Sequence, residues 1–248
     1  MFIHKIYILL VVVFFSACNT IYLPSSQSPN LFEKKKQGML SVAGFSANTN
    51  VKFAYSPINN FFVSGAVTAP GLINNSILLN PKYYDYELGL GCYKKIDEIN
   101  HIEFQTGYGI RKFAVADESF ENVYITIYRF PDIGSYKKFN IQGIYTYTPL
   151  CKKFNVGIAN RLSILNAKYT SRSQYNKPND FDNPWIVETT FFLKINVSKR
   201  FNLYGAAGLC YNFKQIDIPL ANPFFLRLGL EAKLFKFKNS SYINKPKN

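Results

Sequence analysis

The chain has 248 residues, of which 48% are apolar, 17% aromatic and 18% charged. This composition excludes collagen, a disordered low-complexity chain and a disulfide-dense miniprotein. The net charge of +14 is spread along the sequence, and no long basic arm or helical stripe gathers it. We therefore expect no nucleic-acid partner.

The N-terminus has the layout of a secretion signal. A short basic stretch that ends at Lys5 is followed by an unbroken apolar run over residues 6–15. This run is too short to span a membrane as a helix, which needs about 20 residues. Residues 1–17 are therefore predicted to be a signal peptide.

The next feature is a candidate lipidation site. The four residues Phe15-Ser16-Ala17-Cys18 fit a bacterial lipoprotein box, in which Cys18 becomes the lipidated first residue of the mature protein. The alternative is ordinary cleavage near Ala17, with Cys18 incidental. Because the following residues are rich in Ser, Pro and Asn, the stretch 18–37 is interpreted as a lipid-anchored tether.

From residue 38 to residue 237, apolar and polar residues alternate, which predicts β-strands in a single domain. A polar tail follows at 238–248. Residues 121–130 also look strand-like and would extend a hairpin beyond the main sheet. The first three candidate strands are short, so eight strands with a separate N-terminal hairpin is an alternative to ten. The ten candidates are 38–47, 49–57, 60–68, 83–95, 99–113, 135–148, 153–168, 185–198, 201–214 and 223–237.

The connections between these strands alternate in length. Short ones at 56–60, 95–100, 148–153 and 198–200 alternate with long ones at 69–82, 114–135, 169–184 and 215–222. This rhythm is typical of transmembrane β-barrels. We therefore predict an all-β fold: an antiparallel, up-and-down transmembrane β-barrel of about 8–10 strands. An even strand number places both ends of the barrel domain with the short turns, on the periplasmic side.

Alternation alone cannot tell whether the apolar face points inward, as in a soluble lipocalin-like barrel, or outward, as in a membrane barrel. Two features favour the membrane barrel. Aromatic residues such as Tyr147, Phe154, Trp185, Phe201 and Phe224 stand at strand ends, where membrane interfaces select them. The polar faces also carry charges of both signs, which predict a paired network in a narrow lumen. These charges are Glu87, Glu103, Arg111, Arg161, Glu188, Arg227 and Glu231.

The chain resembles the small outer-membrane β-barrel proteins of Gram-negative bacteria, and within them lipid-anchored Bacteroidetes-type members. The box at Phe15-Ser16-Ala17-Cys18, the leader from Tyr22 to Phe32, and the stretch Tyr55 to Asn60 carry this resemblance together with the strand rhythm. It implies an outer-membrane location, contact with outer-membrane lipid, and insertion by the outer-membrane assembly machinery. One departure is the polar tail after Phe237, where many such barrels end on an aromatic residue.

The sequence offers little for catalysis or for a cofactor. After signal cleavage one histidine remains, His101, which is predicted to be a solvated residue beside a short turn. Asp180 and Asp182 lack the spacing of a calcium loop. The remaining cysteines and the Gly-x-Gly pairs fit no disulfide framework, zinc site or phosphate loop; they are Cys92, Cys151, Cys210, Gly89-x-Gly91 and Gly107-x-Gly109.

These observations predict a protein that is not an enzyme and needs no cofactor or metal. The expected role is structural or interactive, with long outward loops that could bind a protein or small-molecule partner, and with a narrow, charge-paired lumen. A small pore or ligand-binding barrel is the first alternative. A soluble, lipocalin-like periplasmic lipoprotein is the second.

Overall fold

The computed structural model describes residues 27–45, 48–70, 84–115, 132–149, 153–170, 178–181, 183–213 and 224–236. The predicted signal peptide, Cys18, the strand-like stretch 121–130 and the polar tail 238–248 all lie outside these residues. No helix in the described ranges is long and apolar enough to cross a membrane.

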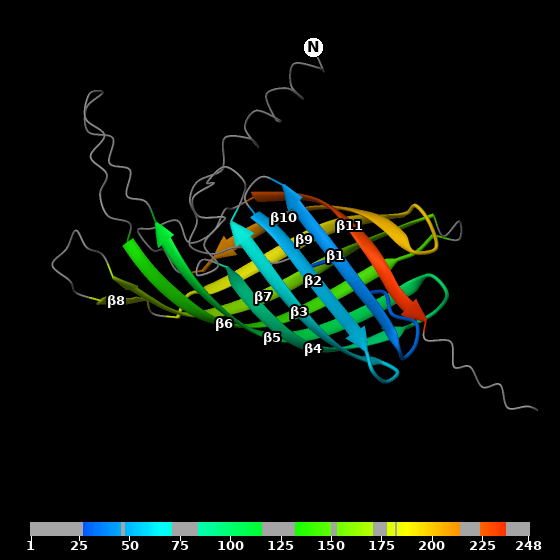
Figure 1. Cartoon of the computed structure of the whole chain (residues 1–248), viewed down its shortest axis with the longest axis horizontal. Helices are drawn as coiled ribbons and strands as arrows, with labels where there is room; N and C mark the ends of the chain where they lie inside the picture. Colours follow the sequence, from blue (N-terminus) through cyan, green and yellow to red (C-terminus); the bar gives the residue numbers. More distant parts are fainter. Residues whose placement is uncertain are drawn as a thin grey trace, which may run out of the picture.

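Most of the described residues lie in β-strands. Ten of these strands close into one antiparallel barrel (Figure 1). Each barrel strand pairs with its neighbour in sequence, and β1 pairs with β11 to close the ring. The barrel strands are β1 (Gln37–Phe45), β2 (Asn48–Ser56), β3 (Phe61–Pro70), β4 (Asp85–Lys95), β5 (Asn100–Val115), β6 (Asp132–Tyr147), β7 (Phe154–Thr170), β9 (Trp185–Asn196), β10 (Phe201–Asn212) and β11 (Phe224–Lys236).

The ten predicted strands are confirmed, and no predicted end differs from the observed one by more than three residues. The first three strands belong to the barrel, so the eight-strand alternative is wrong. One strand was not predicted: β8 (Pro178–Phe181) lies in the stretch 169–184 that was expected to be a loop. It pairs with the last four residues of β7, because β7 continues past the point where β9 begins and leaves an edge open to a partner.

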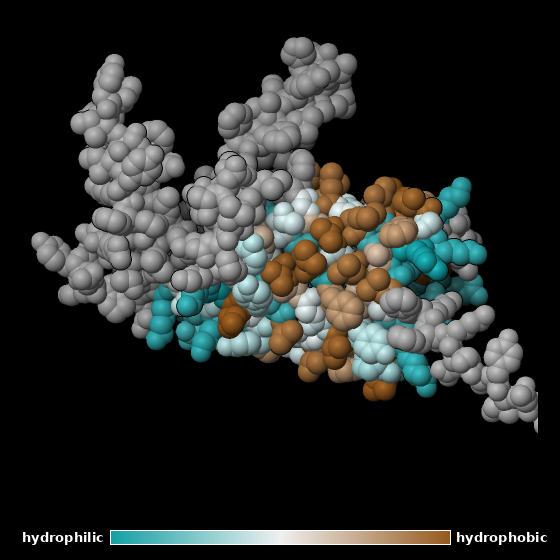
Figure 2. Space-filling model, viewed as in Figure 1, coloured by the Kyte–Doolittle hydropathy of each residue, from teal (hydrophilic) through white to brown (hydrophobic). Residues whose placement is uncertain are grey.

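Most charged side chains of the strand interiors point into the barrel together with some apolar ones such as Phe62 and Phe192, whereas the outward faces of the strands are mainly apolar. Along β9, Glu188 and Lys194 are fully buried, whereas Phe191 between them is 61% exposed. Figure 2 shows hydrophobic residues across the middle of one face and hydrophilic residues at both of its ends. The strand-end aromatics also face outward, among them Tyr147, Phe154, Trp185, Phe201, Phe213 and Phe224. This is the arrangement of a transmembrane barrel, and the opposite of a lipocalin-like one.

The two ends of the barrel differ. β1 begins and β11 ends at the same end, where Gln37 pairs with both Ser56 and Lys236. The connections 57–60, 96–99, 148–153 and 197–200 lie there as well, and we call this the short-turn end. The opposite, loop end carries the longer connections after β3, β5, β7 and β10, together with the two-residue link from β1 to β2.

Side chains fix the short turns. Asp97 accepts hydrogen bonds from the side chain of Asn100 and from the backbone N–H groups of Ile99 and Asn100. The Asn100 side chain first, and then the backbone donors, lower the pKa of Asp97 below its usual value. Such local bonds end one strand and start the next within a few residues.

We expect the protein to behave as a membrane barrel on detergent gels. The unboiled form should migrate faster than the boiled form, because a closed barrel stays compact in detergent. Extraction from membranes should need detergent even for Cys18→Ala, since the apolar exterior alone holds the barrel in lipid. Release of Cys18→Ala by salt or alkaline washing would contradict this.

Candidate functional site

The lumen holds the charged side chains that the sequence singled out. All seven lie inside the barrel and none is more than 7% exposed: Glu87, Glu103, Arg111, Arg161, Glu188, Arg227 and Glu231. They do not contact one another as a single network. The structure divides them between a cluster nearer the loop end and a cluster nearer the short-turn end, each of which includes residues that the sequence analysis did not select.

Lys138 is the centre of the loop-end cluster. Its ammonium lies 2.7 Å from a carboxylate oxygen of Asp85 and 2.8 Å from one of Glu87. Tyr136 donates a hydrogen bond to the same Asp85 oxygen at 2.9 Å. Lys138, Gly109 and Glu87 stand in one row across β6, β5 and β4. A Cβ at Gly109 would lie 2.6 Å from Lys138 Cε, so the glycine leaves room for the lysine to cross β5.

Arg161 joins this cluster from β7. Its guanidinium lies 3.4 Å from Glu87 and 3.7 Å from Glu188, and its Nε donates to Gln142 at 2.8 Å. Strand register explains two of these contacts, because Gln142 and Glu188 stand directly opposite Arg161 on the two neighbouring strands. Alternation on adjacent strands therefore brings opposite charges into contact without any loop.

The two other predicted arginines also face the lumen nearer the loop end, on opposite sides of the ring, with Arg111 on β5 and Arg227 on β11. Arg111 stands opposite Asp85 in the pairing of β4 with β5. Arg227 donates to Asn48 Oδ1 at 3.5 Å, and its guanidinium carbon lies 4.8 Å from the ring centre of Phe225. The aromatic face is a favourable surface for a guanidinium.

The short-turn cluster is built on two carboxylates. Glu231 pairs with Lys194 at 2.5 Å and accepts a hydrogen bond from Asn202 at 3.0 Å. Glu103 lies 3.5 Å from Nδ1 of His101. The prediction that His101 is a solvated turn residue is wrong: it points into the lumen, is buried, and stacks on Tyr93. His101 shares the inward-facing side of β5 with Glu103 and Gln105, which places its side chain inside the barrel.

The chain's own N-terminal segment fills the lumen between these clusters. Gln27–Phe32, which we call the lumen segment, belongs to the stretch 18–37 that was interpreted as a tether, and it runs inside the barrel. Residues 33–36 turn at the short-turn end, where Lys35 N–H donates to Asn59 and Lys36 N–H to Ser56. From there the segment passes inward until Gln27 donates to Glu188 at 2.9 Å.

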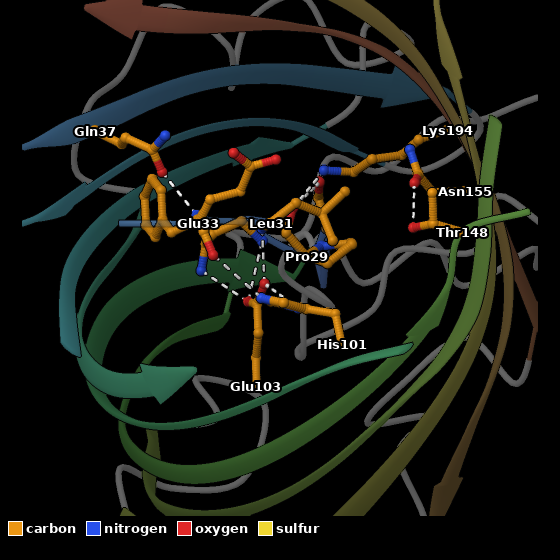
Figure 3. Close-up of polar contacts among 12 residues, drawn as sticks. Pro29, Leu31, Glu33, Gln37, His101, Glu103, Thr148, Asn155 and Lys194 are labelled. Atoms are coloured by element: carbon orange, nitrogen blue, oxygen red, sulfur yellow. Dashed lines mark hydrogen bonds and ion pairs between the residues drawn. The ribbon is translucent and has the colours of Figure 1, made fainter. Parts of the chain in front are cut away.

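Charged wall residues hold the lumen segment. Figure 3 shows Glu103 directed at it from below and Lys194 from the right. Glu103 accepts hydrogen bonds from Asn30 N–H and Nδ2, each at 3.0 Å, and from Leu31 N–H at 2.7 Å. The other contacts are Lys194 with the Pro29 carbonyl, Lys52 with the Ser28 carbonyl at 2.9 Å, Ser28 Oγ with Glu231 at 3.0 Å, and His101 with the Phe32 carbonyl at 3.3 Å.

An aromatic pocket inside the barrel anchors the end of the lumen segment. The Phe32 ring lies 6.0 Å from the ring of Phe62 and 5.8 Å from that of Tyr93, and Met39 and Ala54 complete the buried cluster. Phe32 therefore adds apolar burial to the polar contacts of its neighbours.

Several residues of the site were missed by sequence reasoning. Asp85, Lys138 and Lys194 occupy polar faces that the alternation already displayed, so taking every charge on those faces would have found them. Lys52 could have been found in the same way, because Asn50 and Lys52 alternate with Val51 and Phe53 along β2. The lumen segment carries no periodic signal, because its bonds go to the barrel wall and not to a strand ladder.

Among the remaining sequence candidates, Cys210 is buried and stands opposite Glu188 in the pairing of β10 with β9. Asp182 lies outside the described residues, as does the side chain of Asp180. No group of three or more potential metal ligands occurs among the residues that the structure describes. Cys92 and Cys210 are free cysteines within strands.

No known family model matches the chain, and no curated protein sequence matches it. Among solved structures, the KdgM porin has 11% identity and a TM-score of 0.38, with 80% of this chain and 99% of the porin covered. The translocator domain of the autotransporter NalP from Neisseria meningitidis has 10% identity and a TM-score of 0.39, covering 80% of this chain and 86% of that one. The NanC porin has 13% identity and a TM-score of 0.32, covering 80% and 99%. A likeness at this level is confined to barrel architecture.

Lys138→Met tests the loop-end cluster. It leaves Asp85 and Glu87 buried without the ammonium between them, and breaking a buried ion pair costs about 3–5 kcal/mol. On detergent gels, we expect the Lys138→Met variant to change from the folded to the unfolded form at a clearly lower temperature than the wild type. Lys137→Met is the matched control, because Lys137 is exposed on the outer face of the same strand. Equal stability of the two variants would contradict a paired lumen.

Proposed function

We propose that this chain is an outer-membrane β-barrel lipoprotein whose lumen is closed by its own N-terminal segment, and that its role is structural or interactive and not enzymatic. The observation that carries the proposal is the lumen segment, held by charged wall residues on opposite sides of the barrel. A closed barrel cannot conduct freely, so its working surfaces are its ends and its exterior.

The chemistry of the lumen supports a non-enzymatic role. Its described carboxylates accept hydrogen bonds or ion pairs from lysines, arginines, amide side chains and the lumen segment. Such neutralisation stabilises the native barrel, whereas a catalytic site keeps a group available for substrate. We infer that the charges serve to fill and rigidify the barrel.

The orientation follows from the unequal ends. We propose that the short-turn end faces the periplasm and the loop end faces outward, as in other outer-membrane barrels. Partners would then be outer-membrane lipid around the apolar belt, the assembly machinery during insertion, and a protein or small molecule at the long loops.

Planar-bilayer recording tests the closed lumen. The wild-type protein should show no steady open level, because the lumen segment and the charge clusters occupy the passage. A stable conductance of the wild type would contradict the closed barrel and would favour the pore.

A gated pore is the second candidate. The contacts that hold the lumen segment in the polar lumen are non-covalent, so the segment could leave and open the passage. Leu31→Pro should release the segment for two reasons. Proline lacks the N–H that donates a hydrogen bond to Glu103, and its ring fixes φ near −65°, whereas Leu31 has a φ of 51°. Leu31→Asn is the control, since asparagine keeps the N–H and tolerates a positive φ. We expect openings in Leu31→Pro and none in Leu31→Asn; equal conductance would contradict control by the segment.

Lipidation of Cys18 stays a prediction from the sequence. Intact-mass measurement of the purified protein should show a mature chain that starts at Cys18 and carries acyl chains, and Cys18→Ala should lack them. An unmodified mature N-terminus would favour ordinary cleavage near Ala17. If a reagent that cannot cross the outer membrane labels the mature N-terminus in intact cells, the proposed periplasmic placement of that N-terminus is wrong.

A further inference from the structure

The barrel wall holds the lumen segment mainly through its peptide backbone. Three of the contacts described above involve side chains of the segment: those of Gln27, Ser28 and Asn30. Five involve backbone atoms: the carbonyls of Ser28, Pro29 and Phe32 and the N–H groups of Asn30 and Leu31. Because every polypeptide has these groups, most of the recognition does not depend on the sequence of the segment.

Two wall residues depend on a peptide in the lumen for their hydrogen bonds. Lys52 is 2% exposed, and its hydrogen bond goes to the Ser28 carbonyl; among the described residues no carboxylate lies within ion-pair distance of it. Glu103 is 1% exposed and receives three of its hydrogen bonds from the segment. A buried ammonium that needs a carbonyl and a buried carboxylate that needs N–H donors together match a peptide chain.

The backbone conformation of the lumen segment matches the hydrogen-bonding groups of the barrel wall. Leu31 has a φ of 51°, a left-handed value that is uncommon for a bulky residue and costs free energy. Successive N–H groups in such a turn point to one side and form an anion-binding concavity, which the Glu103 carboxylate occupies. The wall therefore fits the backbone geometry of the segment, in addition to the Phe32 ring and the side chains of Gln27, Ser28 and Asn30.

We propose that the short-turn end of the lumen is a binding site for a polypeptide segment of another molecule that adopts the same turn. The incoming segment would place carbonyl oxygens at Lys52 and Lys194, two successive N–H groups at Glu103, and an aromatic side chain in the pocket of Phe62 and Tyr93. The chain's own lumen segment occupies the site until such a peptide displaces it. This inference rests on the proposed closure of the lumen by that segment.

A synthetic peptide of residues 27–36, labelled with a fluorophore at its C-terminus, tests the site by fluorescence anisotropy with full-length protein in detergent. Leu31→Pro should bind the peptide roughly tenfold or more tightly than the wild type, because the tethered segment of the wild type competes at high effective concentration. Leu31→Asn should bind like the wild type. Phe32→Ala, which weakens the segment through its aromatic anchor, should also bind more tightly and serves if Leu31→Pro fails to fold.

Modified peptides test recognition of the backbone. N-methylation at Asn30 and Leu31 removes both donors to Glu103 and should weaken binding by about tenfold or more. Methylation at Phe32 is the control, because no hydrogen bond from that N–H occurs among the described residues. Alanine at positions 27, 28 and 30 should change binding by only a few fold. Loss of binding with alanine but not with methylation, or equal loss with the control, would overturn the proposal.

Conductance of the same preparations separates the two proposals. If Leu31→Pro conducts but does not bind the unmodified peptide, the lumen segment closes the barrel and the peptide site is wrong. If the wild type conducts steadily, the closed barrel is wrong. Methylation-sensitive binding to the weakened variants supports the peptide site in either case.

Discussion

The structure depends on the cost of placing charges inside a barrel that is surrounded by lipid. An isolated charge in such an interior costs several kcal/mol, and only an opposite charge or several hydrogen bonds can offset it. In this barrel, side chains of opposite charge from different strands meet in the lumen. Arg161 lies between Glu87 and Glu188, and Lys138 lies between Asp85 and Glu87. The alternation of polar and apolar residues along the strands and the pairing of charges inside the lumen both follow from this cost of burying charge.

Strand pairing does not satisfy every charge. Near the short-turn end, Glu103 and Lys52 face the lumen without an opposite charge on a neighbouring strand, and the lumen segment supplies the missing donors and acceptor. The N-terminal segment is therefore part of the interior of the barrel in the same sense as the wall residues. Its turn at Leu31 exists because two N–H groups must point at one carboxylate.

The sequence was sufficient to predict the barrel, because alternation with a period of two is set by which face meets lipid. β9 and β11 illustrate this: Phe191 and Leu228 face outward, and Glu188 and Arg227 face inward, as the pattern predicts. Contacts between distant residues could not be predicted in the same way. Lys138 reaches Glu87 across Gly109 because of the register of three strands. His101 was predicted wrongly and the lumen segment was not predicted, because a short polar stretch looks the same whether it faces water or a polar lumen.

The position of the lumen segment in the chain sets an order for assembly. Only residues 33–36 separate it from β1, and β1 pairs with β11, the last of the described strands. The seam between β1 and β11 joins the most distant parts of the barrel, so it is the pairing with the highest loop-closure cost. Once that seam has formed, the segment can enter only by threading through an end. We therefore expect the nascent sheet to curl around the lumen segment and the seam to close last, so that the segment acts as an internal template for barrel closure.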